Sequence, residues 1–213
     1  PKGYKDLFIG VHRLFKDPNL FQWIGFTILY KLGDTFLNIM STPFLMDCAY
    51  SLVFIASIGK TFGIGFIMIG TTLGAIYLSQ HYSLKNLVIS ALILQCLSSF
   101  LFYFHITEKN METLYIATAL QNFSCGWGSV GYIAYISQKS QGIGAATTFA
   151  LMASVGSFVR VLLSYMGGIT AHTLSWAEFY GFLGIGIIMV IIWMIYFFPN
   201  HNALDKKTKK VSI

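Results

Sequence analysis

The run LFQWIGFTILYKLGDTFLNIMSTPFLM, residues 20–46, is apolar except for a few polar positions around its middle. A helix that crosses a bilayer needs roughly 20 mostly apolar residues, and this run supplies them. Lys31 and Asp34 are three residues apart, and Asn38 and Ser41 continue that spacing, so the four side chains share one helix face. The run therefore predicts a membrane-spanning helix with a polar stripe along one side.

Five further apolar runs follow, at residues 52–78, 86–105, 113–136, 145–171 and 177–198. Backbone groups in lipid must bond within their own segment, so runs of this length are helices rather than open strands. The whole chain is 55% hydrophobic and 10% charged, whereas a soluble domain carries about 25% charged residues. We therefore expect an all-α, polytopic membrane protein in which residues 20–199 form a bundle of six transmembrane helices.

One side of the predicted bundle carries nearly all the basic residues, and such residues favour the cytoplasmic side. They lie before the first run, after the second and fourth runs, and after the sixth: Lys2, Lys5, Arg13, Lys16, Lys85, Lys139, Lys206, Lys207, Lys209 and Lys210. Both termini are therefore expected in the cytoplasm, with residues 1–19 as a linker or interfacial segment and 200–213 as a basic tail. The net charge of +6 follows from this topology, so the lipid bilayer is an expected partner and nucleic acid is not.

Four charged residues fall inside the predicted spans: Lys31, Asp34, Lys60 and Arg160. A charge inside the bilayer is costly and usually faces a cavity or a partner. At 1.5 Å per residue, Asp34 lies roughly 20 Å into its helix, near the middle of the bilayer. Burial favours the neutral form of its carboxyl group and Lys31 favours the charged form, which suits a group that binds and releases a proton. Asp34 is therefore the candidate for proton coupling, and the alternative is a structural pair with Lys31.

Six side chains are candidates for substrate binding: Lys31, Asn38, Lys60, Gln121, Asn122 and Arg160. The partner of Arg160 is either an anionic ligand or Asp34 on a neighbouring helix, because guanidinium makes bidentate contacts with carboxylates and phosphates. Lys60 either binds substrate or extends to the membrane surface. Gln121 and Asn122 either line a polar path or hydrogen-bond a neighbouring helix.

The runs 86–105 and 177–198 hold no charge in their interiors, so these two helices are expected to face lipid. GWGSVG at residues 126–131 matches the dinucleotide fingerprint GxGxxG, but it lies inside a spanning run and no acidic residue follows until Glu178. Its glycines, like Gly70 and Gly74, are therefore expected at close helix contacts. The sequence shows neither a catalytic triad nor metal-ligand spacing, so neither an enzyme nor a metal cofactor is expected.

Four stretches, taken in order, resemble one family of transporters. They are ILYKLGDTFLNIMSTPFL (28–45), IGKTFGIGFIMIGTTLGAIYL (58–78), LQNFSCGWGSVGYIAYI (120–136) and TTFALMASVGSFVRVLLSYMGG (147–168). Together they resemble the C-terminal six-helix half of AmpG-type muropeptide permeases of the major facilitator superfamily. In such facilitators the halves are related by a pseudo-twofold axis, and substrate sits between them near the midplane.

The resemblance implies half of a major facilitator fold in a bacterial inner membrane. It implies a secondary active transporter that imports anhydro-muropeptides by proton symport, which links it to peptidoglycan recycling and β-lactamase induction. The proton is the expected coupling ion, and no other cofactor is implied. The implied partner is an N-terminal six-span half or a second copy of the chain. The alternatives are a carrier of another anionic metabolite such as acetyl-CoA, and an inactive or regulatory half-transporter fragment.

Overall fold

The computed structural model describes residues 12, 16, 18, 20–141 and 144–197, with Lys60 and Phe197 placed by their backbone alone. Most of the predicted linker and all of the predicted basic tail lie outside the described residues. Within them the secondary structure is helical, and the helices are α2 (Leu20–Asp47), α3 (Leu52–Ala56), η1 (Ser57–Phe62), α4 (Gly63–Ser79), α5 (Leu84–Glu108), α6 (Met111–Lys139), α7 (Ala145–Thr173) and α8 (Trp176–Phe197).

These helices form six rods that correspond to the six predicted runs. One rod is compound, because α3, η1 and α4 follow one another without a break. Its middle part, η1, is a π-helix, a rare geometry that is often found at functional sites, and it contains the backbone of Lys60. The all-helical prediction is therefore confirmed, whereas the apolar run gave no sign of the π-helical turn.

Short polar signals set the ends of the rods. α5 ends at Glu108, and the left-handed φ of 51° at the next residue, Lys109, turns the chain. Asn110 then caps α6, because its side-chain oxygen accepts a hydrogen bond from the Glu112 backbone N–H at 2.9 Å. At the start of α8, Ser175 and Glu178 form a reciprocal capping box, with side-chain to backbone bonds of 2.9 and 3.3 Å. These caps keep the connections between the rods short.

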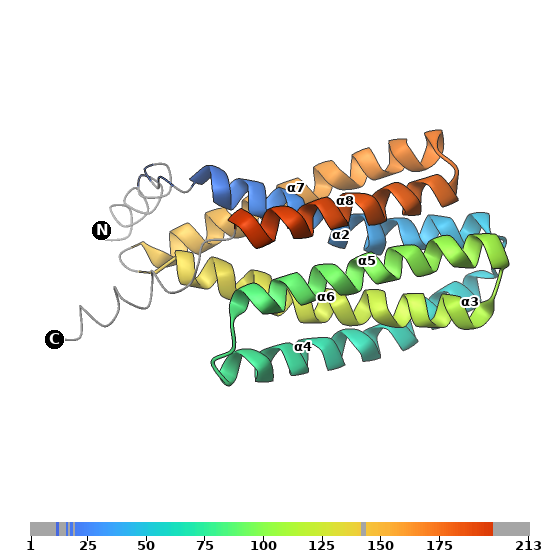
Figure 1. Ribbon diagram of the computed structural model, residues 1–213, viewed down its shortest axis with the longest axis horizontal. Helices are drawn as coiled ribbons and strands as arrows, with labels where there is room; N and C mark the ends of the chain where they lie inside the picture. The colour runs from blue at the N-terminus through green and yellow to red at the C-terminus, as the bar shows by residue number, and fades with distance from the viewer. Residues whose placement is uncertain (1–11, 13–15, 17, 19, 142–143, 198–213) are drawn as a thin grey trace.

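The rods lie side by side along the long axis of the molecule, and α2 begins at the same end at which α8 ends (Figure 1). α6 packs along α4 and α5, α5 packs along α8, and α2 packs along α7. The core contains large aromatic and aliphatic side chains, among them the fully buried Tyr30, Phe44, Phe102 and Tyr180. This arrangement places the middle of α2 against both α6 and α7.

Four of the six rods are long and apolar enough to cross a membrane, judged by length and composition: Leu52–Ser79, Leu84–Glu108, Ala145–Thr173 and Trp176–Tyr196. α2 and α6 are as long, with 28 and 29 residues. They contain the polar positions, such as Lys31 and Asp34 in α2 and Gln121 and Asn122 in α6, and these lower their hydropathy. The chain is thus a multi-pass membrane protein, and the number of six spans stays a prediction.

The prediction that the third and sixth rods, α5 and α8, face lipid stays a prediction, although both are more enclosed by neighbouring helices than the rods of α4 and α7. Half of the most apolar stretch of α5 is buried, against 18% for Leu52–Ser79 and 28% for α7. The reason is its position, because α5 packs against both α6 and α8 and bonds to α8 through Ser99, whose hydroxyl donates to the Tyr180 carbonyl at 2.8 Å. The rods with the most exposed apolar surface are therefore those of α4 and α7.

Glycines let α4 and α6 approach closely. A Cβ atom on Gly70 would strike the carbonyl oxygen of Phe123, and one on Gly126 would strike the carbonyl oxygen of Ile67. Gly74 lies nearby, against the backbone of Trp127 and the side chain of Val130. The prediction that these glycines serve close helix contacts is confirmed.

We expect Gly70→Leu to lower the free energy of unfolding by about 3 kcal/mol or more, because the added side chain meets backbone atoms that cannot move aside. Gly65→Leu is the matched control on the same helix, since a Cβ at Gly65 meets no atom within 4 Å. The measurement is denaturant unfolding in mixed micelles. Equal losses in the two variants would contradict the close contact between α4 and α6.

Candidate functional site

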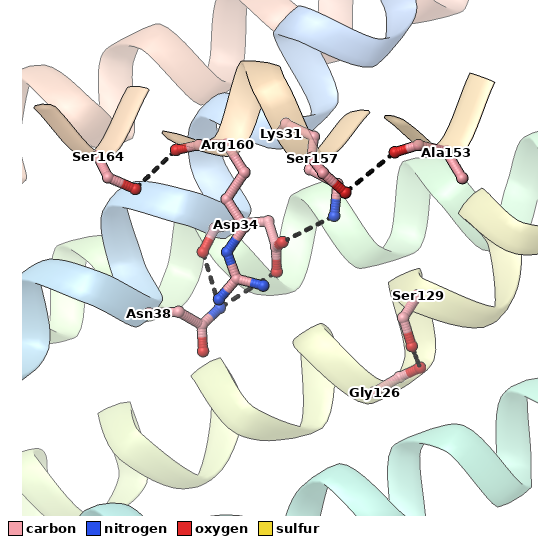
Figure 2. Close-up of polar contacts among 9 residues, drawn as sticks. All are labelled: Lys31, Asp34, Asn38, Gly126, Ser129, Ala153, Ser157, Arg160 and Ser164. Carbon is pink, nitrogen blue, oxygen red and sulfur yellow. Dashed lines mark hydrogen bonds and ion pairs between the residues drawn. The ribbon is translucent and has the colours of Figure 1, made fainter. Parts of the chain in front are cut away.

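A buried carboxylate lies at the middle of α2 and is held from two sides. Asp34 is 8% exposed. Lys31 Nζ lies 3.3 Å from its Oδ2. Asn38 Nδ2 donates to its Oδ1 at 3.1 Å and to its backbone oxygen at 2.7 Å (Figure 2). The structure thus brings together three of the residues that the sequence singled out, on the predicted face of α2.

The ammonium of Lys31 has a second contact, on α6. Its Nζ lies 4.7 Å from the ring centroid of Tyr132 and 5.9 Å from that of Tyr30, within the range of cation–π interaction. The two rings are stacked, with centroids 5.6 Å apart and planes 7° from parallel. Gly128 makes room for the hydroxyl of Tyr30, and Gly156 makes room for that of Tyr132, since a Cβ on either glycine would strike that hydroxyl. The aromatic pair is therefore a fixed surface beneath Lys31.

Cys125 of α6 lies beside the same carboxylate, close to Asp34 and Asn38. Sequence reasoning did not assign Cys125 or Tyr132 to the site. The available signal was their spacing, since Gln121, Cys125, Gly128 and Tyr132 recur at three- and four-residue intervals and share a face of α6. That spacing does not show which neighbouring helix the face meets.

The two predicted amides of α6 have different surroundings. Gln121 is 3% exposed, and its Nε2 donates to the Leu37 carbonyl of α2 at 2.8 Å. Its Oε1 has no hydrogen-bond partner among the described residues. Asn122 donates to Thr118 in its own helix at 2.8 Å and lies against Gly63 at the start of α4. Gln121 thus joins α6 to α2 near the site, whereas Asn122 faces α4.

Arg160 is exposed on α7, and its side chain extends toward the Asp34–Asn38 pair (Figure 2). The ion-pair partner of Asp34 is Lys31, and in the described part of the chain Arg160 forms no ion pair. The adjacent hydroxyls bond within α7, Ser157 to the Ala153 carbonyl and Ser164 to the Arg160 carbonyl. The structural pair between Arg160 and Asp34 is therefore not formed, and the guanidinium is available to an anion. The side chain of Lys60 lies outside the described residues.

A bundle of long apolar helices with an ion pair buried at its middle is typical of a membrane transport protein, because intramembrane charges mark substrate and ion pathways. No family model matches the chain. AmpG 1 of Rickettsia felis is 30% identical over 161 residues, which are 75% of this chain and 36% of that protein. AmpG 2 of Rickettsia typhi is 28% identical over 202 residues, 94% of this chain and 49% of that protein.

AmpG 2 of Rickettsia prowazekii is 29% identical over 190 residues, 89% of this chain and 46% of that protein. These curated relatives are named as transporters. The resemblance to AmpG is thereby confirmed, and the chain is homologous to part of these proteins. It spans less than half the length of each of them.

We expect Lys31→Leu and Asp34→Leu each to lower the free energy of unfolding by about 2 kcal/mol, because each leaves a buried charge without its partner. The side chains are 16% and 10% exposed, so the loss stays below that of a fully buried pair. The double variant should recover most of the loss, measured as a double-mutant cycle by denaturant unfolding. Additive losses would show that the two side chains do not interact.

Proposed function

We propose that this chain is the C-terminal half of a secondary active transporter that imports anhydro-muropeptides together with protons. The observation that supports the proposal is the Lys31–Asp34 pair, buried at the middle of α2 in a chain whose relatives are AmpG transporters. Ionisable residues at such depth are expensive and are retained where they bind ions or substrate. Recovery of cell-wall fragments for peptidoglycan recycling is the biological role that this activity would serve.

Asp34 is the proton carrier in this proposal. Its Oδ2 faces Lys31 and its Oδ1 accepts from Asn38, so a proton arriving at Oδ2 breaks one contact and leaves the other. The carboxyl group therefore keeps its position in both protonation states. A fixed position suits a group that must meet a proton from one side of the membrane and release it to the other.

The cargo would bind around this carboxyl group through groups of two kinds. Lys31, Arg160 and Lys60 would bind its carboxylates, because cations are the natural partners of anionic groups. Asn38, Gln121 and Asn122 would bind its sugar hydroxyls. Gln121 is the best placed of the three amides, since its Oε1 has no described partner and its helix faces α2 at the site. Asn122 faces α4, so its role requires a cargo that extends in that direction.

In the membrane we propose six spans, with both termini on the cytoplasmic side of a bacterial inner membrane. α2 and α6 would cross with the other four rods, because several of their polar residues, Gln121 among them, lie on the faces that meet near Asp34 and Lys31. Their remaining surface is apolar and packs against neighbours in the same bundle. The loop charges support this orientation, since basic residues favour the cytoplasmic side.

We further propose that a second six-span unit covers the site, either an N-terminal half or another copy of the chain. The curated relatives are more than twice as long as the part that the chain matches. α4 and α7 carry large exposed apolar side chains, including Met68, Leu73, Phe158 and Tyr165. Arg160 is exposed on the same α7, so a cargo between two units would meet it.

The test is uptake of labelled anhydro-muropeptide into proteoliposomes under an imposed proton gradient, with the chain alone and with a candidate N-terminal half. We expect Asp34→Asn to abolish gradient-driven accumulation while cargo exchange without a gradient persists, because the site remains but no longer carries a proton. Asp47→Asn is the matched control, since Asp47 lies at the end of α2 and accepts from Trp176 Nε1 at 2.9 Å, away from the site.

Full accumulation by Asp34→Asn would contradict its role as proton carrier. If folded protein takes up no muropeptide in either format, the substrate is wrong, and competition by acetyl-CoA then tests the carrier of another anionic metabolite. Absence of all uptake, with and without a second half, would support an inactive or regulatory fragment.

We expect Arg160→Met to weaken muropeptide binding by about tenfold or more, because a hydrogen bond to a charged group contributes about 1.5–3 kcal/mol. Arg160→Lys should restore part of the affinity, since it keeps the charge and loses the bidentate geometry. Isothermal titration in lipid nanodiscs gives both dissociation constants. Unchanged affinity together with weaker assembly of the two halves would instead place Arg160 at the interface between the halves.

A further inference from the structure

We propose that Lys31 links proton binding to anion binding, because Asp34 and an anionic group of the cargo compete for its ammonium while the ring of Tyr132 holds that ammonium in place. Protonation of Asp34 frees Lys31 for a carboxylate of the cargo, and deprotonation expels that carboxylate. The inference rests on the proposed function for the identity of the cargo, but the exchange of partners at Lys31 depends on this chain's residues alone.

The geometry that carries this proposal is the double contact of Lys31. Its Nζ lies 3.3 Å from Asp34 Oδ2 and 4.7 Å from the centroid of the Tyr132 ring. The ion pair exists when Asp34 is charged and disappears when it is protonated. The cation–π contact depends on the ring face, which does not change with pH. One partner of Lys31 is therefore switchable and the other is permanent.

Tyr132 acts as a positioning residue because its own place is fixed by three helices. It belongs to α6, stacks on Tyr30 of α2 and sets its hydroxyl over Gly156 of α7. A lysine has a long flexible stem, and a released lysine would otherwise move toward water. With the ring beneath it, the ammonium stays beside Asp34 and faces whatever anion enters.

The charges balance in a simple way. With Asp34 ionised, Lys31 and Asp34 sum to zero. A proton that binds Oδ2 turns the carboxylate into a neutral carboxylic acid, so the pair becomes +1. One carboxylate of the cargo then returns the sum to zero. Since uncompensated charge is expensive at this depth, a proton and an anionic group are each stabilised by the other, at one proton per anionic group.

The other titratable or charged groups that face the pair do not replace this exchange. Among the side chains that the structure describes, they are Tyr30 on α2, Cys125 and Tyr132 on α6, and Arg160 on α7. Arg160 keeps its charge at any pH reached in a cell, so it adds a constant attraction for anions. On the side of α2 that faces α5 and α8, Gly33, the residue before Asp34, lies against Gln95 of α5 and Ile187 of α8. Neither of these side chains is ionisable. Asp34 is thus the group whose charge changes.

The first experiment follows Lys31 directly, without any cargo. The chain is labelled with ¹³C at lysine Cε in lipid nanodiscs, and the Lys31 signal is identified by its loss in Lys31→Arg. We expect an upfield shift from the ring current of Tyr132, lost in Tyr132→Leu and kept in Tyr132→Phe. Lowering the pH should move the signal in one step in the native chain and leave it in place in Asp34→Asn. A pH-dependent step that persists in Asp34→Asn, or an unchanged signal in Tyr132→Leu, would overturn the proposal.

The second experiment adds anhydro-muropeptide to the same nanodiscs in weak buffer and counts protons with an indicator dye. We expect about one proton to be taken up for each cargo molecule that binds, both in the native chain and in Asp47→Asn. In Asp34→Asn we expect no proton uptake. We also expect Tyr132→Leu to bind cargo about tenfold more weakly, since the cation–π contact is then lost. Equal proton uptake in Asp34→Asn would contradict the exchange at Lys31.

The two experiments separate failure of the cargo from failure of the exchange. If muropeptide does not bind while the Lys31 signal behaves as expected, the proposed substrate is wrong and sodium acetate replaces it as a plain carboxylate probe. In Asp34→Asn, acetate should then move the Lys31 signal. In the native chain, acetate should move the signal at low pH, where Asp34 is protonated, and leave it in place at high pH. An acetate effect that is the same at both pH values would overturn the proposal by itself.

Discussion

The structure depends above all on the high free energy of a charge in an apolar interior. An ammonium and a carboxylate lie about one helical turn apart at the middle of α2, and each is costly there without the other. The surrounding contacts follow from this constraint. Asn38 donates a hydrogen bond to the second carboxylate oxygen of Asp34. The ring of Tyr132 lies against the ammonium of Lys31, and glycines of α6 and α7 make room for the aromatic rings at this position.

The same constraint explains how the helices are arranged. α6 has many polar residues for a helix in lipid, and it is also the helix that packs along both α4 and α5 and supplies Cys125, Tyr132 and Gln121 to the site. α4 and α7 have fewer partners within the chain and expose more apolar surface. Polar contacts inside the bundle and apolar surface outside it are thus divided between helices, which is consistent with the proposal that another unit covers the site.

The helices could be predicted from the sequence because each apolar run has the length of a span and each polar stripe has helical spacing. The ion pair of Lys31 and Asp34 could be predicted for the same reason, since both belong to one helix. Two contacts between α6 and α2 could not be predicted, because they depend on how α6 is rotated against α2. They are the contact of Tyr132 with Lys31 and that of Cys125 with Asp34. The extent to which α5 is enclosed by α6 and α8 could not be predicted either, since the absence of charge in a run does not show how many neighbours its helix has.

The π-helical turn at Ser57–Phe62 has a consequence for the register of the chain. A π-helical turn accommodates an extra residue, and one residue corresponds to a rotation of about 100° around a helix axis. The turn takes up that extra residue locally, so the flanking helices α3 and α4 keep the faces that they present to their neighbours. Loss of a single residue inside the turn would restore a regular α-helix and leave Gly70 and Gly74 facing α6, whereas loss of a residue between the turn and Gly70 would rotate both glycines away. A difference of one residue between this chain and a relative is therefore better tolerated inside the turn than between the turn and the glycines.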